Sequence, residues 1–134
     1  MTDVLVDSNV LLDVATRDPR WGDWSAQALE AAADGSTLVI NPLIYAEVSI
    51  RFATIEELEE AIPATAFRRD SLPYEAGFLA GKAFLDYRRR GGRRTSPLPD
   101  FYIGAHAAIA GLSLLTRDAT RYRTYFPTVR VVAP

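Results

Sequence analysis

Four acidic residues fall at positions that could bring their carboxylates to one edge of a folded domain. Asp7 follows the apolar run Val4–Val6, which is typical of a buried strand, and Asp118 follows a second apolar run in "LLTRDATRY". Asp100 lies in the first turn of a predicted helix in "PLPDFYIGAHA", and Glu47 lies one turn into another in "PLIYAEV". A buried, ionised carboxylate such as Asp7 is costly unless a helix N-terminus or a cation compensates its charge.

Together these acids predict a site for a hard divalent cation. Four clustered carboxylates repel one another unless a cation binds them, and oxygen ligands without thiolate or imidazole suit Mg²⁺ or Mn²⁺. Each acid also has an ordinary explanation when it is taken alone. Asp100 could complement a helix dipole, Glu47 could face solvent, and Asp118 could be an N-cap. The coincidence of all four with strand ends and helix starts favours the metal site.

The elements that must position these acids alternate along the chain. Apolar runs typical of strands alternate with helical patterns, which predicts an α/β fold with a central parallel sheet of four to five strands flanked by helices. The predicted strands are 4–7, 37–40, 113–116 and 129–132, and the predicted helices include 8–15, 23–34, 42–51, 74–90 and 99 to about 111. Ligands of such sheets bind outside the carboxyl ends of the strands, where Asp7 and Asp118 are expected.

The composition narrows the class of protein. Hydrophobic residues make up 49% and charged residues 24% of the 134 residues, as in ordinary globular domains, so we expect one domain over residues 1–134. The absence of cysteine excludes disulfides, thiolate zinc sites and cysteine nucleophiles. No apolar run approaches the length of about 20 residues that spans a bilayer, and the N-terminus lacks the basic region of a signal peptide, so a cytoplasmic location is expected.

The four motifs also resemble a known family. In this order, "VDSNVLLD", "YAEV", "LPDFYIGAHA" and "LLTRD" resemble PIN-domain ribonucleases, particularly the VapC-type toxins of type II toxin–antitoxin pairs. The resemblance covers nearly the whole chain. It implies a single PIN-like domain with the activity of a metal-dependent endoribonuclease, in which a divalent ion (Mg²⁺ or Mn²⁺) held by Asp and Glu activates the water that hydrolyses RNA phosphodiester bonds.

The resemblance also implies roles for individual residues and for partners. Carried over by position, the metal ligands are Asp7 and Asp100, the acids that complete the catalytic site are Glu47 and Asp118, and the supporting polar residues are Asn9 and Thr116. The implied partners are an RNA substrate, a cognate antitoxin protein and a second copy of the chain in a homodimer, with no membrane.

Three other classes compete with this interpretation. A haloacid dehalogenase-like phosphatase needs a second aspartate two residues after the first, but Asn9 stands there, and no lysine occurs late in the chain. A response-regulator receiver also needs a late lysine, whereas Lys82 is the only lysine. A catalytically silent α/β binding module would differ from the nuclease in not binding a metal ion.

Arginine accounts for fourteen of the fifteen basic residues, and five arginines lie in "DYRRRGGRRTSPLPD" immediately before Asp100. A GC-rich genome would also enrich arginine. However, a chain of net charge −2 needs some local basic patch to attract RNA, and the arginine fork suits phosphate. Cations stabilise the last turn of a helix, which explains the arginines before Gly91 but not Arg93 and Arg94. These two are therefore candidate RNA-binding residues.

We predict that the double substitution Arg93→Ala/Arg94→Ala weakens binding of single-stranded RNA without changing metal affinity. Each lost phosphate contact should flatten the slope of log K against log[salt] by roughly 0.7. Binding titrations at several salt concentrations measure this slope. An unchanged slope, together with weaker binding of the antitoxin, would show that the arginines serve the protein partner instead.

Overall fold

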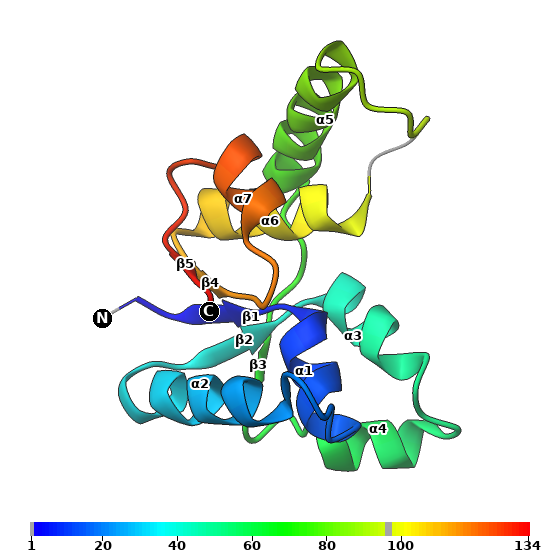
Figure 1. Ribbon diagram of the computed structural model, residues 1–134, viewed down its shortest axis with the longest axis vertical. Helices are drawn as coiled ribbons and strands as arrows, with labels where there is room; N and C mark the ends of the chain where they lie inside the picture. The colour runs from blue at the N-terminus through cyan, green and yellow to red at the C-terminus, as the bar shows by residue number, and fades with distance from the viewer. Residues whose placement is uncertain (1, 96–97) are drawn as a thin grey trace.

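Five short strands form one parallel sheet at the centre of the computed structural model, which describes residues 2–95 and 98–134 (Figure 1). The strands are β1 (Val4–Val6), β2 (Leu38–Ile40), β3 (Arg68–Arg69), β4 (Ser113–Leu115) and β5 (Val131–Val132). The helices are α1 (Ser8–Ala15), α2 (Gly22–Gly35), α3 (Pro42–Ser49), α4 (Ile55–Ala61), α5 (Tyr74–Arg89), α6 (Pro99–Ala110) and α7 (Thr120–Tyr125).

The order of the strands places β1 at the middle of the sheet. The order is β3-β2-β1-β4-β5, and every neighbouring pair is parallel. The chain therefore proceeds from β1 to β2 and β3 in one direction, and then crosses to β4 and β5 on the other side of β1. Such a reversal leaves a crevice at the carboxyl ends of the two strands that flank it. Here those strands are β1 and β4.

Helices cover both faces of the sheet. Figure 1 shows α1 to α4 on one side of the strands and α5 to α7 on the other. All residues of β1, β2 and β4 are buried, which explains why these strands are continuous apolar runs rather than alternating patterns. Among the residues that the structure describes, no helix has both the length and the apolar character needed to cross a membrane.

The predicted α/β fold is confirmed, and the sheet has five strands. Asp7 and Thr116, which were predicted as the last residues of strands, lie immediately beyond β1 and β4. The sequence did not predict β3 or α7. Both residues of β3 are exposed arginines at the edge of the sheet, and α7 has only six residues, so neither carries the hydrophobic periodicity that identifies an element.

A close approach at Gly104 fixes the position of α7. A Cβ atom on Gly104 of α6 would lie 2.3 Å from the Phe126 ring, which follows the last residue of α7. The backbone amide of Phe126 in turn donates to the Tyr122 carbonyl at 2.8 Å. The absence of a side chain at residue 104 therefore lets α7 pack against α6.

We predict that Gly104→Ala lowers the free energy of unfolding by about 1–3 kcal/mol, because the Phe126 ring must shift in a packed core. Urea denaturation measures the change. Gly81→Ala in α5 is the matched control, since a Cβ there meets nothing within 4 Å and alanine is the better helix former. A Gly104→Ala protein as stable as wild type would show that the ring moves at no cost.

Candidate active site

Asp7 lies at the end of β1 and is the N-cap of α1. Its backbone is extended, and its Oδ1 atom accepts a hydrogen bond of 2.8 Å from the Ser8 amide. Only 3% of the residue is exposed. The positive end of the α1 dipole and this amide compensate part of the buried negative charge. The helix N-terminus that the sequence offered as one explanation for Asp7 is therefore present.

The second carboxylate oxygen of Asp7 accepts two short hydrogen bonds and a longer one, of 3.5 Å, from Asn9 Nδ2. Thr116 Oγ1 donates to Asp7 Oδ2 at 2.8 Å from the end of β4, and the Tyr122 hydroxyl donates to the same oxygen at 2.9 Å from α7. Asn9 Nδ2 donates to Thr116 Oγ1 at 3.2 Å, and Asn9 Oδ1 accepts from the Arg117 amide at 3.0 Å. The two supporting polar residues predicted from the sequence, Asn9 and Thr116, thus both lie beside Asp7 and join β4 to α1.

Asp100 contacts the same cluster from the first turn of α6. The Tyr122 hydroxyl lies 3.3 Å from Asp100 Oδ1, so it stands between the carboxylates of Asp100 and Asp7. The Arg121 Nη1 atom donates to Asp100 Oδ2 at 3.2 Å. A tyrosine hydroxyl carries a single proton, so it can donate fully to only one of the two carboxylates.

Glu47 reaches the cluster from α3. The Ser8 hydroxyl donates to Glu47 Oε1 at 3.0 Å, while the Ser8 amide donates to Asp7. Ser8 therefore orients two of the predicted acids at once. The Glu47 residue is half-buried, unlike the fully buried Asp7.

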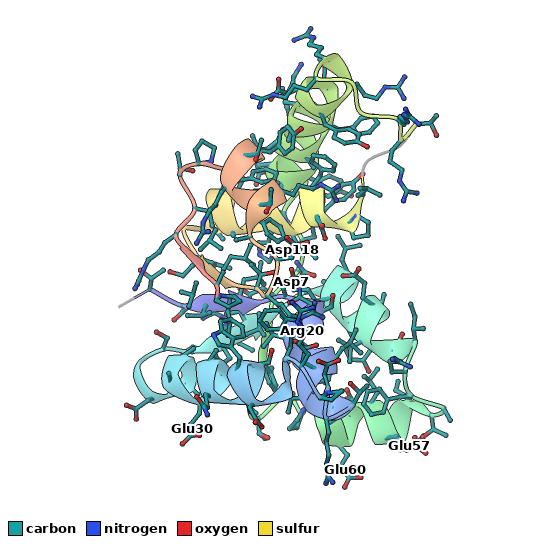
Figure 2. All side chains as sticks on the ribbon, in the orientation of Figure 1. Asp7, Arg20, Glu30, Glu57, Glu60 and Asp118 are labelled. Atoms are coloured by element: carbon teal, nitrogen blue, oxygen red, sulfur yellow. The ribbon has the colours of Figure 1, made fainter. Side chains whose placement is uncertain are left out.

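Asp118 follows β4 and joins the cluster through its backbone. Its amide donates to Thr116 Oγ1 at 3.2 Å. Figure 2 shows Asp7 and Asp118 near each other at the centre of the view, while Glu30, Glu57 and Glu60 lie on the outer helices. Asp118 is one of the residues that line a hollow of about 320 Å³, which we call the α5–α7 hollow. The residues that line it are Tyr87, Asp100, Asp118, Thr120, Arg121, Thr124 and Tyr125.

The pKa values of two acids respond to this arrangement. Burial raises the pKa of Asp7 above its usual range, and the charge of Asp100 adds to the effect, while hydrogen bonds from Thr116 and Tyr122 oppose it. Burial also raises the pKa of Glu47, with contributions from the charges of Asp7 and Asp100. The charge of Asp100 therefore reaches both Asp7 and Glu47, which places the three carboxylates in one cluster.

The pKa of the Tyr122 hydroxyl is also raised. Burial is the main cause, and the charges of Asp7 and Asp100 act in the same direction. Only 1% of Tyr122 is exposed. The hydroxyl therefore keeps its proton at neutral pH and remains a hydrogen-bond donor between the two carboxylates.

The donor set fits a hard divalent cation by its chemistry, since all of its charged ligands are carboxylate oxygens. In residues 2–95 and 98–134, however, no three Asp, Glu, His or Cys side chains already stand in an arrangement that could hold one ion. Asp7 and Asp100 are instead bound by hydroxyl and guanidinium donors. These donors occupy oxygens that a cation would need.

Three residues of this site were missed by the sequence interpretation, namely Ser8, Arg121 and Tyr122. Ser8 stands next to Asp7, and its hydroxyl could have been assigned a polar partner. Arg121 and Tyr122 lie on α7, the helix that the sequence did not predict, so no pattern placed them opposite Asp100.

Arg117 and His106 have structural roles in the fold. Arg117 donates two hydrogen bonds, of 2.8 and 3.0 Å, to the buried Asp13, which ties the segment after β4 to α1. His106, the single histidine, is buried and hydrogen-bonded to Asn41 at 3.0 Å. Burial lowers the pKa of His106, which keeps the ring neutral.

The candidate arginines Arg93 and Arg94 are exposed, and the Arg88 side chain donates to the Arg94 carbonyl.

Comparison with known proteins identifies the family. The PIN-domain family model matches residues 4–127, so the chain belongs to the PIN-domain family. No curated protein matches the sequence.

Solved structures share the fold at low sequence identity. A chain of VapBC2 from Rickettsia felis, bound to a DNA fragment from its promoter, is 16% identical and superposes with a TM-score of 0.73, covering 97% of both chains. A toxin–antitoxin complex from Klebsiella pneumoniae gives 23% identity and a TM-score of 0.71, covering 97% of this chain and 96% of the other. FitAcB from Neisseria gonorrhoeae gives 17% identity and a TM-score of 0.70, covering 96% and 95%.

The raised pKa of Asp7 predicts how the metal-free protein responds to pH. The folded state binds the Asp7 proton more tightly than the unfolded state, whose pKa is about 3.9. The stability from protonated Asp7 is thus fully present below that pH and is lost as the pH rises through the raised pKa of the folded state. Asp7→Asn keeps a good N-cap and removes the charge. In EDTA, the free energy of unfolding of this variant should therefore increase relative to that of wild type as the pH rises from 4 to 8.

Urea denaturation at several pH values measures this difference. Asp34→Asn, which makes the same change at an exposed position on α2, is the control variant. An Asp7→Asn protein that is less stable than wild type at pH 8 would show that hydrogen bonds to the charged carboxylate outweigh its desolvation.

Proposed function

We propose that this protein is a metal-dependent endoribonuclease and the toxin of a toxin–antitoxin pair. One observation carries the proposal. Asp7, Glu47 and Asp100 come from three separate elements and meet in the crevice at the carboxyl ends of β1 and β4, where the charge of Asp100 raises the pKa of Asp7, and the charges of Asp7 and Asp100 raise that of Glu47. In a PIN-domain chain, such a cluster of acids supports a role in metal-dependent hydrolysis of phosphodiester bonds.

Each acid has a proposed role. Asp7 and Asp100 bind the divalent ion, Mg²⁺ or Mn²⁺, and Glu47 and Asp118 complete the catalytic site. When bound, the ion supplies Lewis-acid chemistry, since it lowers the pKa of water and neutralises negative charge on the phosphate. The Ser8 amide, Thr116 and Asn9 keep the Asp7 carboxylate in one orientation.

The substrate is proposed to be RNA, which the acidic cluster alone would repel. A compensating positive charge is available close to the site, where Arg121 contacts Asp100. Arg93 and Arg94, on the segment that leads to α6, would extend the basic surface toward flanking phosphates. A cytoplasmic location agrees with this substrate.

The proposed protein partners are an antitoxin and a second copy of the chain. The similar structures from Klebsiella pneumoniae and Rickettsia felis are of a toxin–antitoxin complex and of VapBC2. Exposed apolar side chains support such contacts on two separate surfaces. Ile50 and Ile55, which are 81% and 62% exposed, lie near α3 and α4, and Tyr74 and Phe78, which are 96% and 59% exposed, lie on α5.

A catalytically silent binding module is the second candidate. It is favoured by the hydrogen bonds that already satisfy Asp7 and Asp100 without a cation. Such a module would bind an antitoxin or another protein but neither Mn²⁺ nor RNA. Metal binding therefore separates the two candidates.

We predict that the purified protein cuts total RNA with Mn²⁺ and not with EDTA, and that Asp7→Asn and Asp100→Asn each abolish cutting while the fold stays intact. Each amide retains the shape of the side chain but removes the charge that binds the ion. Mapping of RNA ends measures the cuts, and circular dichroism measures the fold. Asp34→Asn should cut as wild type does.

A thermal-shift measurement tests metal binding independently of RNA cutting. Mn²⁺ at about a hundredfold its Kd should stabilise the wild-type protein by roughly 2.7 kcal/mol, and replacement of all four acids by their amides should remove the stabilisation. Full activity of either single variant, or a metal-dependent shift that survives the fourfold replacement, would place the ion elsewhere.

A further inference from the structure

Arg121 stands between the acidic site and the α5–α7 hollow. Its guanidinium donates to Asp100 Oδ2 at 3.2 Å, and its Cζ atom lies 5.9 Å from the centre of the Tyr87 ring and 5.6 Å from that of Phe101. The side chains of Arg121 and Asp100 are 36% and 37% exposed. The guanidinium therefore has solvent on one side and a candidate metal ligand on the other.

The α5–α7 hollow has the chemistry of a nucleotide subsite. Arg121 supplies the positive charge and Thr120 and Thr124 supply hydroxyl groups, while Tyr87 and Tyr125, which pack against each other and against Phe101, form an aromatic wall. Proteins that bind single-stranded nucleic acid combine aromatic side chains, on which bases stack, with cations that contact the phosphates. The hollow also includes Asp100, so a nucleotide in it would lie next to the proposed site of hydrolysis.

We propose that Arg121 is the residue that holds a phosphate of the RNA in the α5–α7 hollow, and that its ion pair with Asp100 competes with binding of the divalent ion to the same carboxylate. The inference rests on the proposed function and deepens it. Binding of a divalent ion to Asp100 would release Arg121, because both cations compete for one carboxylate. The freed guanidinium then reaches a phosphate without new backbone structure.

The contacts of neighbouring arginines make Arg121 the best suited to this exchange. Arg117 donates two hydrogen bonds to Asp13, whose side chain is 4% exposed, and breaking that pair would leave a buried charge. Arg90 pairs with Asp86, which is not one of the proposed metal ligands, so binding of the ion would not release it. The ion pair of Arg121 is partly exposed, and pairs of that kind contribute little to stability, so its exchange for another partner costs little.

The inference has an unusual signature, because one substitution should change metal binding and RNA turnover in opposite directions. Removing the Arg121 charge frees Asp100 and removes a cation that repels the metal ion, so metal affinity should rise. The same change removes a charged hydrogen-bond donor to phosphate, so RNA turnover should fall. If Arg121 only held the Asp100 side chain in position, its removal would increase neither metal affinity nor RNA turnover.

The test is calorimetric titration of Mn²⁺ alone into Arg121→Gln and wild type, followed by measurement of kcat/KM at saturating Mn²⁺ on an RNA strand that the wild type cuts. We expect Arg121→Gln to bind Mn²⁺ about threefold to fivefold more tightly. Its kcat/KM should be lower by about tenfold or more. Arg123→Gln, an exposed position on the same helix, is the matched control and should change neither value.

Arg121→Lys gives a second measurement that does not depend on the glutamine variant. It keeps the charge but loses the fork, so Mn²⁺ affinity should stay near that of wild type while kcat/KM recovers only in part. Unchanged Mn²⁺ affinity in Arg121→Gln, or weaker Mn²⁺ binding with lower turnover, overturns the inference while the nuclease proposal stands. A wild-type protein that neither binds Mn²⁺ nor cuts RNA overturns both.

Discussion

The buried carboxylate of Asp7 is the constraint around which the site is built. A charge at the end of the central strand must be compensated, and the protein supplies the first amide of α1, a hydroxyl at the end of β4 and a hydroxyl on α7. These three donors come from three parts of the chain. The compensation of one charge therefore fixes how α1, β4 and α7 meet at the crevice of the sheet.

The position of α7 depends on packing as well as on polar contacts. Gly104 lets the Phe126 ring approach α6, and this contact holds α7 where Tyr122 reaches both Asp7 and Asp100. The bidentate pair between Arg117 and Asp13 holds the segment that leads into α7 against α1. Six residues of helix would be marginal alone, so these tertiary contacts stabilise α7.

The hydrogen bonds at the site explain how a cluster of acids can exist in a stable protein. Hydrogen-bond donors satisfy Asp7 and Asp100, and burial together with mutual repulsion raises the pKa of Asp7 and of Glu47. Sites that perform chemistry often sacrifice stability in this way. In the proposed nuclease, a bound cation would remove the repulsion that the protein donors only reduce.

The sequence by itself determined the alternation of elements, because fully buried strands require apolar runs such as Val4–Val6 and helices end at residues such as Gly111. It also located Asp7 and Thr116 at strand ends, because the end of an apolar run can be recognised from the neighbouring residues alone. The edge strand β3 and helix α7 came only from the tertiary structure, because their few polar residues carry no periodic signal. Nor could local pattern place Arg121 and Tyr122 beside Asp100, which lies 21 and 22 residues away along the chain. Contacts over such a separation depend on the packing of α6 against α7, and packing is a property of the whole fold.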